Sequence, residues 1–323
     1  MKGTVLVTGA AGFIGSHLSE RLVHLDYQVI GLDNFDDFYS PAIKWNNIST
    51  LSVASNFQLE QVDIRDTASL TRIFKTNSID IVVHLAARAG VRPSIEKPLL
   101  YLDVNIGGTI NLLEASRIYG VKKFIFASSS SVYGVNNEIP FKEDSKINTP
   151  TSPYASSKAA AELFCRTYTH LYNIPVIVLR LFTVYGPRQR PEMAIHQFVK
   201  KIDSGEEISV FGDGTSKRDY TYVDDIVSGI VQSLHYSKTH KFEIFNLGDS
   251  YSVSLEYLIS LIEKALGKKA KIRSLPVQAG DVPITAAEIS EAKKRIGYQP
   301  KVTIEKGIPL FVKWYQEKKG VAV

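Results

Sequence analysis

The amino-acid sequence predicts an α/β fold in which a doubly wound parallel sheet forms the larger part and a smaller α/β unit follows it. A short apolar run, residues 4–8, leads into a glycine-rich turn and then a helical pattern, which is how doubly wound sheets begin. Further apolar runs alternate with helical segments, as crossover connections between parallel strands require. From about residue 183 the alternation becomes irregular, which indicates a second, smaller domain.

The composition is that of an ordinary globular protein. The 323 residues are 44% hydrophobic and 22% charged, enough to bury a large core. The formal net charge of +5 comes without a sustained basic block, so we expect an anionic small molecule as the partner and no nucleic acid. The single cysteine, Cys165, allows neither an intramolecular disulfide nor a cysteine-based metal cluster, and no metal is expected. Neither a signal peptide nor a membrane-length apolar stretch is recognisable, so we expect a cytoplasmic protein with no membrane partner.

The first turn has the residues of a pyrophosphate-binding site. Gly9, Gly12 and Gly15 are spaced so that the backbone can turn tightly, approach a pyrophosphate and pack the new helix on the sheet. The start of that helix, at Phe13 and Ile14, offers unpaired N–H groups to the anion. We therefore expect these five residues to bind a dinucleotide cofactor.

A second strand, residues 28–32, ends at Asp33, eighteen residues beyond Gly15. A carboxylate at this place can accept hydrogen bonds from both ribose hydroxyls of an adenosine. It would also repel a 2′-phosphate, and no arginine follows it directly, so the sequence favours NAD over NADP. Asn34, the next residue, is assigned to the same cofactor site. The alternative is that Asp33 only caps a turn.

The following strands bring more residues to the same edge of the sheet. Residues 57–62 and 79–87 are predicted to form the third and fourth strands, with a helix at about 69–75 between them. Ligands of such sheets bind at the carboxyl ends of the strands. The residues expected to contact the cofactor there are Asp63, Ile64, Leu85, Ala86 and Ala87.

Two arginines and an asparagine come after the fourth strand. Arg88 and Arg92 flank Gly90 in a loop at the ligand-binding edge, where a guanidinium can bind a phosphate or a carboxylate. The alternative is that both arginines are solvated loop residues. A helix over about 104–119 carries Asn105 near its start, which we assign to the cofactor site.

A serine run and a tyrosine–lysine pair are the candidate reactive groups. The fifth strand, residues 123–127, leads into four serines that include Ser129. Tyr154 and Lys158 lie four residues apart at the start of a helix and so share a face. A lysine beside a tyrosine lowers the pKa of the phenol, and a phenolate is a usable base near neutral pH. Taken alone, the pair favours an ordinary amphipathic helix, and the rest of the chain has to supply the evidence for a reactive site.

Together, the glycine run, Asp33, the serine run and the Tyr154–Lys158 pair resemble the extended short-chain dehydrogenase/reductases, and among them the nucleotide-sugar epimerases and dehydratases. Further segments extend the resemblance nearly end to end: residues 180–191, 211–214, 218–225 and 280–283. The resemblance implies a Rossmann-type sheet, a smaller C-terminal α/β substrate domain, bound NAD and a UDP-sugar substrate.

The resemblance also implies a role for each matched residue. Tyr154 takes the proton of a sugar hydroxyl, Lys158 tunes its pKa and binds the ribose, and Ser129 orients the sugar. Phe211 and Arg218 contact the nucleotide, and Asp281 lies near its ribose. The implied reaction transfers a hydride from sugar C4 to the nicotinamide, and the resulting 4-keto sugar turns over and accepts the hydride on its other face. NAD is then expected to stay bound.

Differences between subfamilies narrow the substrate. Ser130, assigned to the substrate site, and Ser131 stand where 4,6-dehydratases carry Asp and Glu, and decarboxylases usually carry Glu at the second position. Thr183 stands where many 4-epimerases have Asn, and a segment with Arg190 follows it. This pattern resembles the uronic-acid 4-epimerases, so we expect conversion of UDP-glucuronate to UDP-galacturonate. UDP-glucose 4-epimerase is the first alternative and UDP-glucuronate decarboxylase the second.

A physical argument supports the uronate. Its C6 carboxylate can be held by Arg190 and Thr183 through charge-assisted hydrogen bonds, which a neutral hexose does not need. Oxidation at C4 makes a β-keto acid, which loses CO2 when the C5–C6 bond aligns with the carbonyl π system. A site that holds the carboxylate out of that alignment gains affinity and suppresses decarboxylation. The alternative is that Arg190 is a surface loop cation.

Two domains are expected. Residues 1–182 plus about 222–248 would form the NAD-binding domain, and about 183–221 plus 249–323 the nucleotide-sugar-binding domain. The active site would lie in the cleft between them.

The expected assembly is a homodimer. If the chain follows the family, the helices after Val104 and after Tyr154 form a four-helix contact between two copies. A competing hypothesis of another class is a non-catalytic regulator that senses NAD. The intact Ser129, Tyr154 and Lys158 count against it, because a sensor does not need them.

Overall fold

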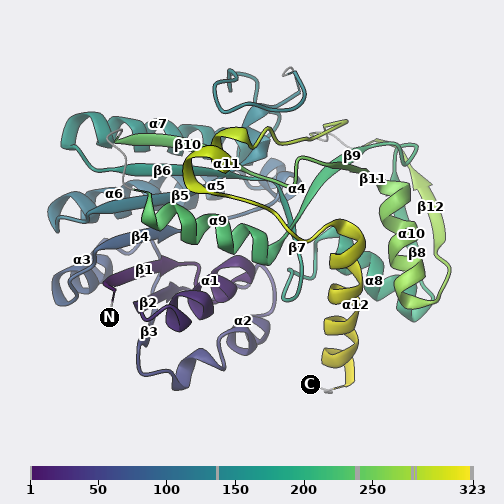
Figure 1. Cartoon of the computed structure of the whole chain (residues 1–323), viewed down its shortest axis with the longest axis horizontal. Helices are drawn as coiled ribbons and strands as arrows, with labels where there is room; N and C mark the ends of the chain where they lie inside the picture. Colours follow the sequence, from purple (N-terminus) through teal and green to yellow (C-terminus); the bar gives the residue numbers. More distant parts are fainter. Residues whose placement is uncertain (1, 136–137, 237–240, 278–279, 281, 321–323) are drawn as a thin grey trace.

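The computed structural model describes residues 2–135, 138–236, 241–277, 280 and 282–320. These residues form a large sheet flanked by helices, with a smaller unit beside it (Figure 1). The strands of the large sheet are β1 (Thr4–Thr8), β2 (Gln28–Asp33), β3 (Phe57–Gln61), β4 (Ile81–His84), β5 (Lys123–Ser129), β6 (Val176–Leu181) and β10 (Phe242–Leu247). The candidate site Asp281 lies outside the described residues.

The large sheet is doubly wound. Its strand order is β10-β6-β5-β4-β1-β2-β3, and every neighbouring pair is parallel. The chain starts in the middle of the sheet and winds outward first on one side and then on the other, so the order reverses between β1 and β4. The predicted fold class is confirmed, and the reversal point is where such sheets bind ligands.

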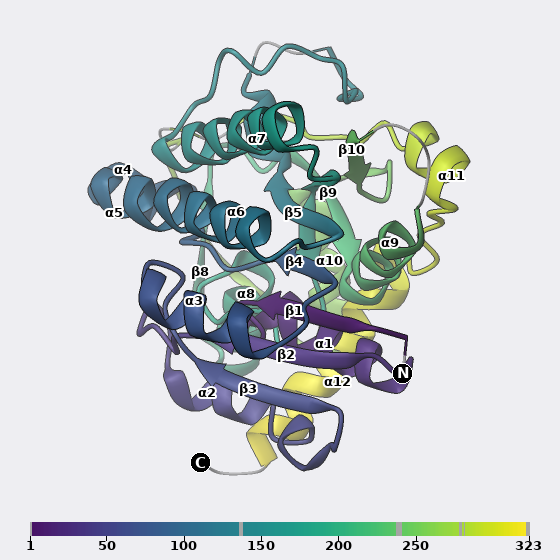
Figure 2. The same cartoon turned by 90° about the vertical axis from the view of Figure 1, so that its left-hand side faces the viewer.

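Helices cover both faces of this sheet (Figure 2). One face carries α1 (Phe13–His24) and α9 (Val223–His235), and the other carries α3 (Thr67–Thr76), α6 (Gly108–Ile118) and α7 (Pro153–Tyr172). Because side chains alternate along a strand, Val5 and Val7 of β1 join the α1 side of the core while Leu6 joins the α7 side. All three are fully buried, as expected for a parallel strand.

The segment predicted as one helix over 104–119 is divided. After α4 (Val91–Glu96) and α5 (Pro98–Tyr101), a π-helical segment η2 (Leu102–Gly107) carries Asn105, and α6 follows. β6 was not predicted, although Val176–Leu179 is an apolar run of the kind that forms a buried strand. The other elements of this part are α2 (Pro41–Asn47), η1 (Leu51–Val53) and η3 (Ser130–Tyr133).

The smaller unit contains two short sheets. Its strands are β7 (Thr183–Tyr185), β9 (Lys217–Tyr222) and β11 (Ser252–Ser254) in one sheet, and β8 (Glu207–Phe211) and β12 (Lys271–Leu275) in the other. The short strands predicted at 208–211 and 270–273 are confirmed as β8 and β12, which pair in parallel. Its helices are α8 (Ala194–Ser204), α10 (Leu255–Leu266) and α12 (Ile304–Gly320). The remaining helix, α11 (Ser290–Ile296), packs against α9 and β10 of the large sheet.

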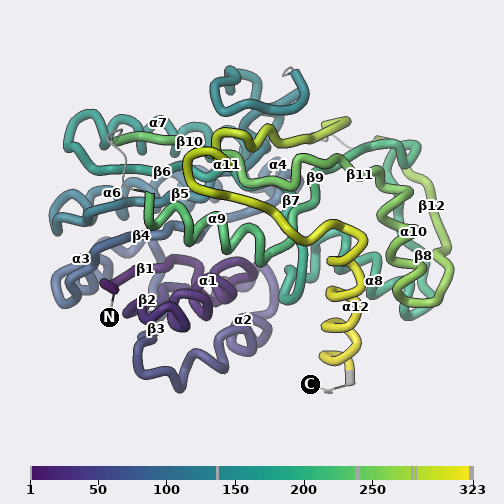
Figure 3. Tube along the Cα trace, in the orientation of Figure 1, coloured from purple at the N-terminus to yellow at the C-terminus, as the bar shows by residue number. Residues whose placement is uncertain are grey.

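The chain passes between the two units more than once (Figure 3). It enters the smaller unit after β6, returns through α9 to place β10 at the edge of the large sheet, and leaves again at β11. The helix at 222–234 and the strand at 243–247 were predicted to return in this way. None of the helices described is both long and apolar enough to span a bilayer.

Candidate active site

A cleft of about 510 Å³ lies at the carboxyl ends of the parallel strands and extends to the smaller unit. Most of the candidate site residues line it. They are Gly9, Gly12, Phe13, Ile14, Gly15, Asp33, Asn34, Asp63, Ile64, Leu85, Ala86, Ala87, Arg88, Ser129, Ser130, Tyr154, Lys158, Thr183, Arg190 and Arg218. The structure thus brings together residues that are up to 209 positions apart in the sequence (218 − 9).

Three candidates lie outside the lining. Asn105 is buried behind it, where its side chain binds the backbone N–H and carbonyl of Arg88 and the hydroxyl of Ser157. Arg92 stacks on the ring of Phe211, with its guanidinium carbon 4.8 Å from the ring centroid. Asn105 therefore shapes the loop after β4, while the Arg92–Phe211 pair joins α4 to β8.

The glycine turn leaves room that no other residue type would leave. Gly9 has φ = +71°, a conformation that side chains disfavour. A Cβ on Gly15 would lie 2.0 Å from the carbonyl oxygen of Gly9, so this position excludes any side chain. α1 begins directly after Gly12, with its N-terminal N–H groups at the cleft. This geometry fits the pyrophosphate of a dinucleotide.

Asp33 ends β2 and is buried at the cleft wall. Its carboxylate accepts hydrogen bonds from the backbone N–H groups of Ala11 (3.1 Å) and Phe35 (2.9 Å). The ammonium of Lys44 lies 3.8 Å away. Burial raises the pKa of Asp33, while the nearby Lys44 charge and the two backbone bonds lower it. The carboxylate is held in a fixed orientation, with lone pairs left for ribose hydroxyls.

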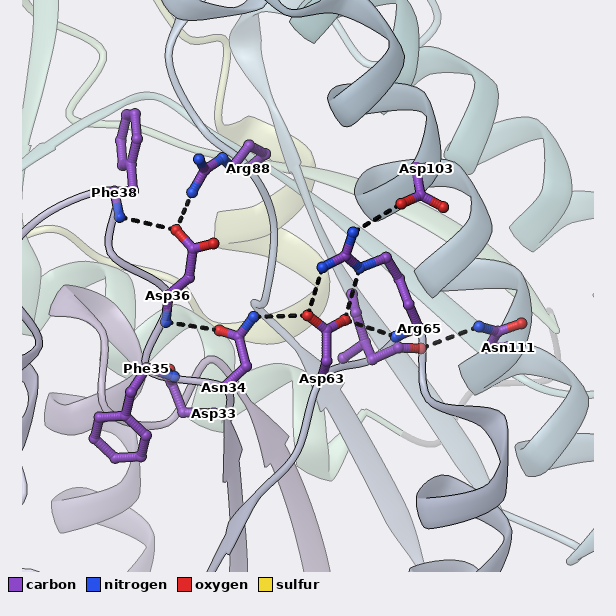
Figure 4. Close-up of polar contacts among 11 residues, drawn as sticks. Asp33, Asn34, Phe35, Asp36, Phe38, Asp63, Arg65, Arg88, Asp103 and Asn111 are labelled. Atoms are coloured by element: carbon purple, nitrogen blue, oxygen red, sulfur yellow. Dashed lines mark hydrogen bonds and ion pairs between the residues drawn. The ribbon is translucent and has the colours of Figure 1, made fainter.

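Asp63, after β3, is held by a neighbouring arginine (Figure 4). Arg65 donates to both of its oxygens and also binds Asp103 at 2.8 Å. The side-chain bond with Arg65 is the main cause that lowers the pKa of Asp63 to about 2. Asn34 donates to Asp63 (2.8 Å) and accepts from the N–H of Asp36 (3.0 Å). The network fixes the cleft edge expected to meet the adenosine.

Arg88 is tied to the same network. Its guanidinium pairs with Asp36 and lies over the ring of Phe38, 4.9 Å from the centroid. Its backbone is held by Asn105. Arg88 was predicted to meet a phosphate or a carboxylate, and the structure places it at the cleft with an acidic partner.

Tyr154 lies in the first turn of α7. Ser152 caps this helix by accepting the N–H of Ala155 at 3.1 Å. The Tyr154 side chain is hydrogen-bonded to Ser129, and the pKa of the phenol is raised, mainly by burial. The hydroxyl of Ser131 donates to Ser129 at 2.8 Å. The serine and tyrosine hydroxyls therefore meet at one point of the cleft.

Lys158 is buried one turn further along α7. Its ammonium donates to the carbonyl of Ala127 (2.8 Å) and lies 4.9 Å from the centroid of the Phe126 ring. Burial lowers its pKa to about 8. From the sequence, Lys158 is expected to lower the pKa of Tyr154. In the structure burial outweighs every favourable charge and the pKa of Tyr154 is raised, with Ser129 and Arg190 as the groups that oppose this.

Arg190 follows β7 and points to the same region. Its Nε pairs with Glu192 at 2.9 Å, and its guanidinium lies 5.7 Å from the centroid of the Phe38 ring. Its positive charge lowers the pKa of Tyr154. Thr183, the first residue of β7, also lines the cleft.

Sequence reasoning missed several lining residues. Lys44 and Tyr39 are the clearest, since the ammonium of Lys44 lies 5.0 Å from the centroid of the Tyr39 ring and close to Asp33. The ring of Phe38 makes cation–π contacts with the guanidiniums of Arg88 and Arg190. These residues lie in an aromatic and polar segment directly after Asp33. The segment has no regular spacing that would single out particular residues.

Comparison with known proteins agrees with this geometry. The chain is 46% identical to a UDP-glucuronate 4-epimerase of Thermodesulfobacterium geofontis, over 98% of this chain and 97% of that protein. A crystal structure of UDP-glucuronic acid 4-epimerase from Bacillus cereus, in complex with UDP-glucuronic acid and NAD, matches with a TM-score of 0.93, 39% identity and coverage of 98% and 99% of the two chains. A UDP-glucose 4-epimerase from Thermotoga maritima matches with a TM-score of 0.90 and 33% identity, over 98% of this chain and 99% of that one.

The family assignment rests on nearly the whole chain. The sequence profile described as GDP-mannose 4,6 dehydratase matches residues 6–310. This range includes the glycine turn, the Ser129–Tyr154 contact and Arg190. The chain therefore belongs to the GDP-mannose 4,6 dehydratase family of extended short-chain dehydrogenase/reductases.

Proposed function

We propose that the chain is an NAD-dependent epimerase that inverts C4 of a UDP-sugar, with UDP-glucuronate and UDP-galacturonate as the two epimers. The observation that carries the proposal is the position of Arg190 in the lining of the same cleft as Tyr154 and Ser129. A hydroxyl pair for chemistry at C4 and a cation for a carboxylate at C6 thus share one site.

The residues that would hold NAD fit that cofactor. Gly9, Gly12 and Gly15 provide the close approach for the pyrophosphate, Asp33 the ribose acceptor, and Ala86 with Ala87 the small side chains along the strand ends. When bound, NAD supplies the acceptor and later the donor of the C4 hydride. The proposal includes that it stays bound through turnover.

The chain's own residues manage the proton. Tyr154 would accept the proton of the C4 hydroxyl and return it after the keto sugar has turned over. Ser129, which is hydrogen-bonded to Tyr154, would orient the C4 hydroxyl of the sugar. Burial raises the pKa of the phenol in this structure, so its ionisation depends on positive charge nearby. Arg190 contributes such a charge, and Lys158 is proposed to contribute a second. Exclusion of water from the cleft strengthens these charge effects.

The uronate carboxylate would be held by Arg190 and Thr183. Arg190 already has Glu192 as a partner, so the substrate carboxylate would join or replace that pair. Holding the carboxylate keeps the C5–C6 bond out of line with the C4 carbonyl, which suppresses loss of CO2. This role separates the proposal from the decarboxylase alternative.

The nucleotide is assigned to the far end of the cleft. Arg218 lines it, and its guanidinium donates to the carbonyls of Lys217 and Pro283. The Arg92–Phe211 stack and Asp281 complete the proposed site. We also propose the domain division expected from the sequence, in which β10 belongs to the NAD-binding unit and β7, β8 and β9 to the sugar-binding unit. Its support is that β10 pairs with β6.

A homodimer is supported by an exposed apolar face. Leu99 is 79% exposed, Leu102 57% and Leu163 61%, and they lie on α5, η2 and α7, which pack side by side (Figure 2). Exposed apolar side chains gathered on adjacent helices are a feature of association surfaces. Light scattering after size exclusion should give twice the mass of the chain, and Leu163→Glu should shift it to the monomer. A monomeric wild type would contradict this assignment. The cytoplasmic location expected from the sequence stays a prediction.

UDP-glucose 4-epimerase remains the second candidate, because the Thermotoga enzyme of that name matches with a TM-score of 0.90. The test is incubation of the purified protein with UDP-glucuronate, without added NAD, followed by NMR of the sugar protons and of CO2 release. Appearance of UDP-galacturonate alone is expected. A pentose product with CO2 would indicate the decarboxylase, and no change would favour the hexose epimerase.

A further inference from the structure

The loop of residues 186–193, which carries Arg190, is attached to the cofactor helix α1 at two points. The ring of His17 donates to the carbonyl of Pro187 at 2.9 Å. The guanidinium of Arg188 donates to the carboxylate of Glu20 at 2.8 Å. Both contacts join residues about 170 positions apart, so they connect the two walls of the cleft directly.

The backbone at Arg188 is in an unfavourable conformation. Arg188 has φ = +64°, a left-handed value that is uncommon for residues other than glycine. Its Nη1 is buried without a hydrogen-bond partner among the described residues. Local costs of this kind persist only where surrounding contacts determine the conformation, and they concentrate at functional sites.

The residue between Arg188 and Arg190 is fixed as well. The N–H of Gln189 donates to the carbonyl of Gly186 (3.1 Å), and its side-chain amide donates to Val184 (3.1 Å). The ring of His196 donates to the carbonyl of Gln189 at 2.8 Å. Arg190 therefore follows a residue held by three hydrogen bonds, and its guanidinium lies over the ring of Phe38.

We propose that Arg188, held by Glu20, is a positioning residue that sets the placement of Arg190 and so the grip on the substrate carboxylate. The Arg188 guanidinium binds α1 through Glu20, and the Arg190 guanidinium, two residues further along the same loop, lies in the cleft lining. Through Arg188, the position of Arg190, and with it the binding of the substrate carboxylate, depends on α1. The N-terminus of this helix would also bind the cofactor pyrophosphate. This inference rests on the proposed function, because it assigns Arg190 to a uronate.

The test compares two ligands on the holoenzyme. UDP-glucuronate needs the carboxylate grip, whereas UDP, as a competitive inhibitor, does not. For Arg188→Ala we expect KM for UDP-glucuronate to rise about 5- to 20-fold, since the charge-assisted contact of Arg190 is weakened but not removed, while Ki for UDP changes less than twofold. Glu20→Gln should move KM in the same direction by less, and Arg188→Lys should restore part of the loss. CO2 released per epimerisation should rise in Arg188→Ala.

The control is Arg72→Ala, which breaks a pair with Glu60 (2.7 Å) on α3 and β3 outside the cleft lining. Arg72→Ala should change neither KM for UDP-glucuronate nor Ki for UDP. Equal changes in KM and Ki, or no change in either for Arg188→Ala with NAD retained, would overturn the inference. If Arg188→Ala does not fold, Glu20→Gln and Arg188→Lys carry the test alone. A wild type that does not turn over UDP-glucuronate would refute the proposed function itself, before any variant is compared.

Discussion

The two walls of the cleft are built differently. The cofactor wall, formed by the β1–α1 turn and the ends of β2 and β3, takes its shape from backbone geometry and from shorter-range contacts. Examples are Asp33 with the N–H of Phe35, 2 positions apart, and Arg88 with Asp36, 52 positions apart. The substrate wall, formed by β7 and residues 186–193, is held by contacts across 168 and 170 positions. Under the proposed function, the first wall would serve any sugar substrate, and the second would determine which sugar is held.

The largest effect is expected from a substitution in the cofactor wall, which should impair activity on every substrate. In Gly15→Ala, the new Cβ would lie 2.0 Å from the carbonyl oxygen of Gly9, so the turn must open. We expect loss of bound NAD and a fall in activity of about 100-fold or more on every substrate, because several pyrophosphate contacts are lost together. NAD released on denaturing the purified protein is the measurement. Gly107→Ala is the control, since its Cβ would meet only Asp103, at 3.9 Å; full NAD content in Gly15→Ala would refute the turn as its site.

Lys158, on α7 in the lining of the same cleft, should limit stability. Folding lowers its pKa from 10.5 to about 8, so the unfolded chain binds more protons between about pH 8 and pH 10.5 and stability should rise with pH across that window. At pH 7 the penalty is at most about 3 kcal/mol. Lys158→Met should therefore abolish activity yet stabilise the fold by up to about 2 kcal/mol, after about 1 kcal/mol is lost at the Ala127 carbonyl.

Urea unfolding at pH 7 and pH 10 measures this. The variant should lack the gain in stability that the wild type shows between the two values. Lys75→Met, at an exposed lysine of α3, should behave like the wild type. A Lys158→Met protein less stable than the wild type at pH 7 would mean that the buried ammonium is well compensated.

On the substrate wall, Arg190→Ala should affect one substrate only. Loss of a charge-assisted contact costs about 1.5 to 3 kcal/mol, so kcat/KM for UDP-glucuronate should fall about 10- to 100-fold while NAD content stays normal. Steady-state kinetics with UDP-glucuronate and UDP-glucose give the comparison. An Arg190→Ala enzyme with full activity on the uronate would place the carboxylate elsewhere.

The smallest effect is expected at the outer edge of the cofactor wall. Arg65 pairs with Asp63 and Asp103 but is 38% exposed, and solvent screens such pairs. Arg65→Ala should weaken NAD retention only a few-fold, as measured by loss of NAD on dialysis, and should leave the preference for UDP-glucuronate unchanged. A changed sugar preference would show that the two walls are not separate in function.

The same contrast explains how much could be predicted from the sequence. The glycine turn, Asp33 and Ser129 were singled out because strand ends of a parallel sheet share one edge. Tyr154 and Lys158 were singled out by their spacing on one helix face and by the family resemblance. Lys44 was missed because it lies on a short helix after a loop without periodicity. The partners of residues 186–193 on α1 could not be predicted, since no local pattern encodes a contact that depends on how two units pack. The direction of the Tyr154 pKa was also wrong, because burial is a property of the packed site.

The most direct test of the central claim uses UDP-glucuronate labelled with deuterium at C4. If the sugar is epimerised by hydride transfer to a retained cofactor and back, the UDP-galacturonate formed by the purified enzyme without added NAD should keep its deuterium at C4, as read by NMR and mass spectrometry. Tyr154→Phe should form labelled product at no more than about a thousandth of the wild-type rate. Exchange of the label with solvent protons at C4 would contradict the account.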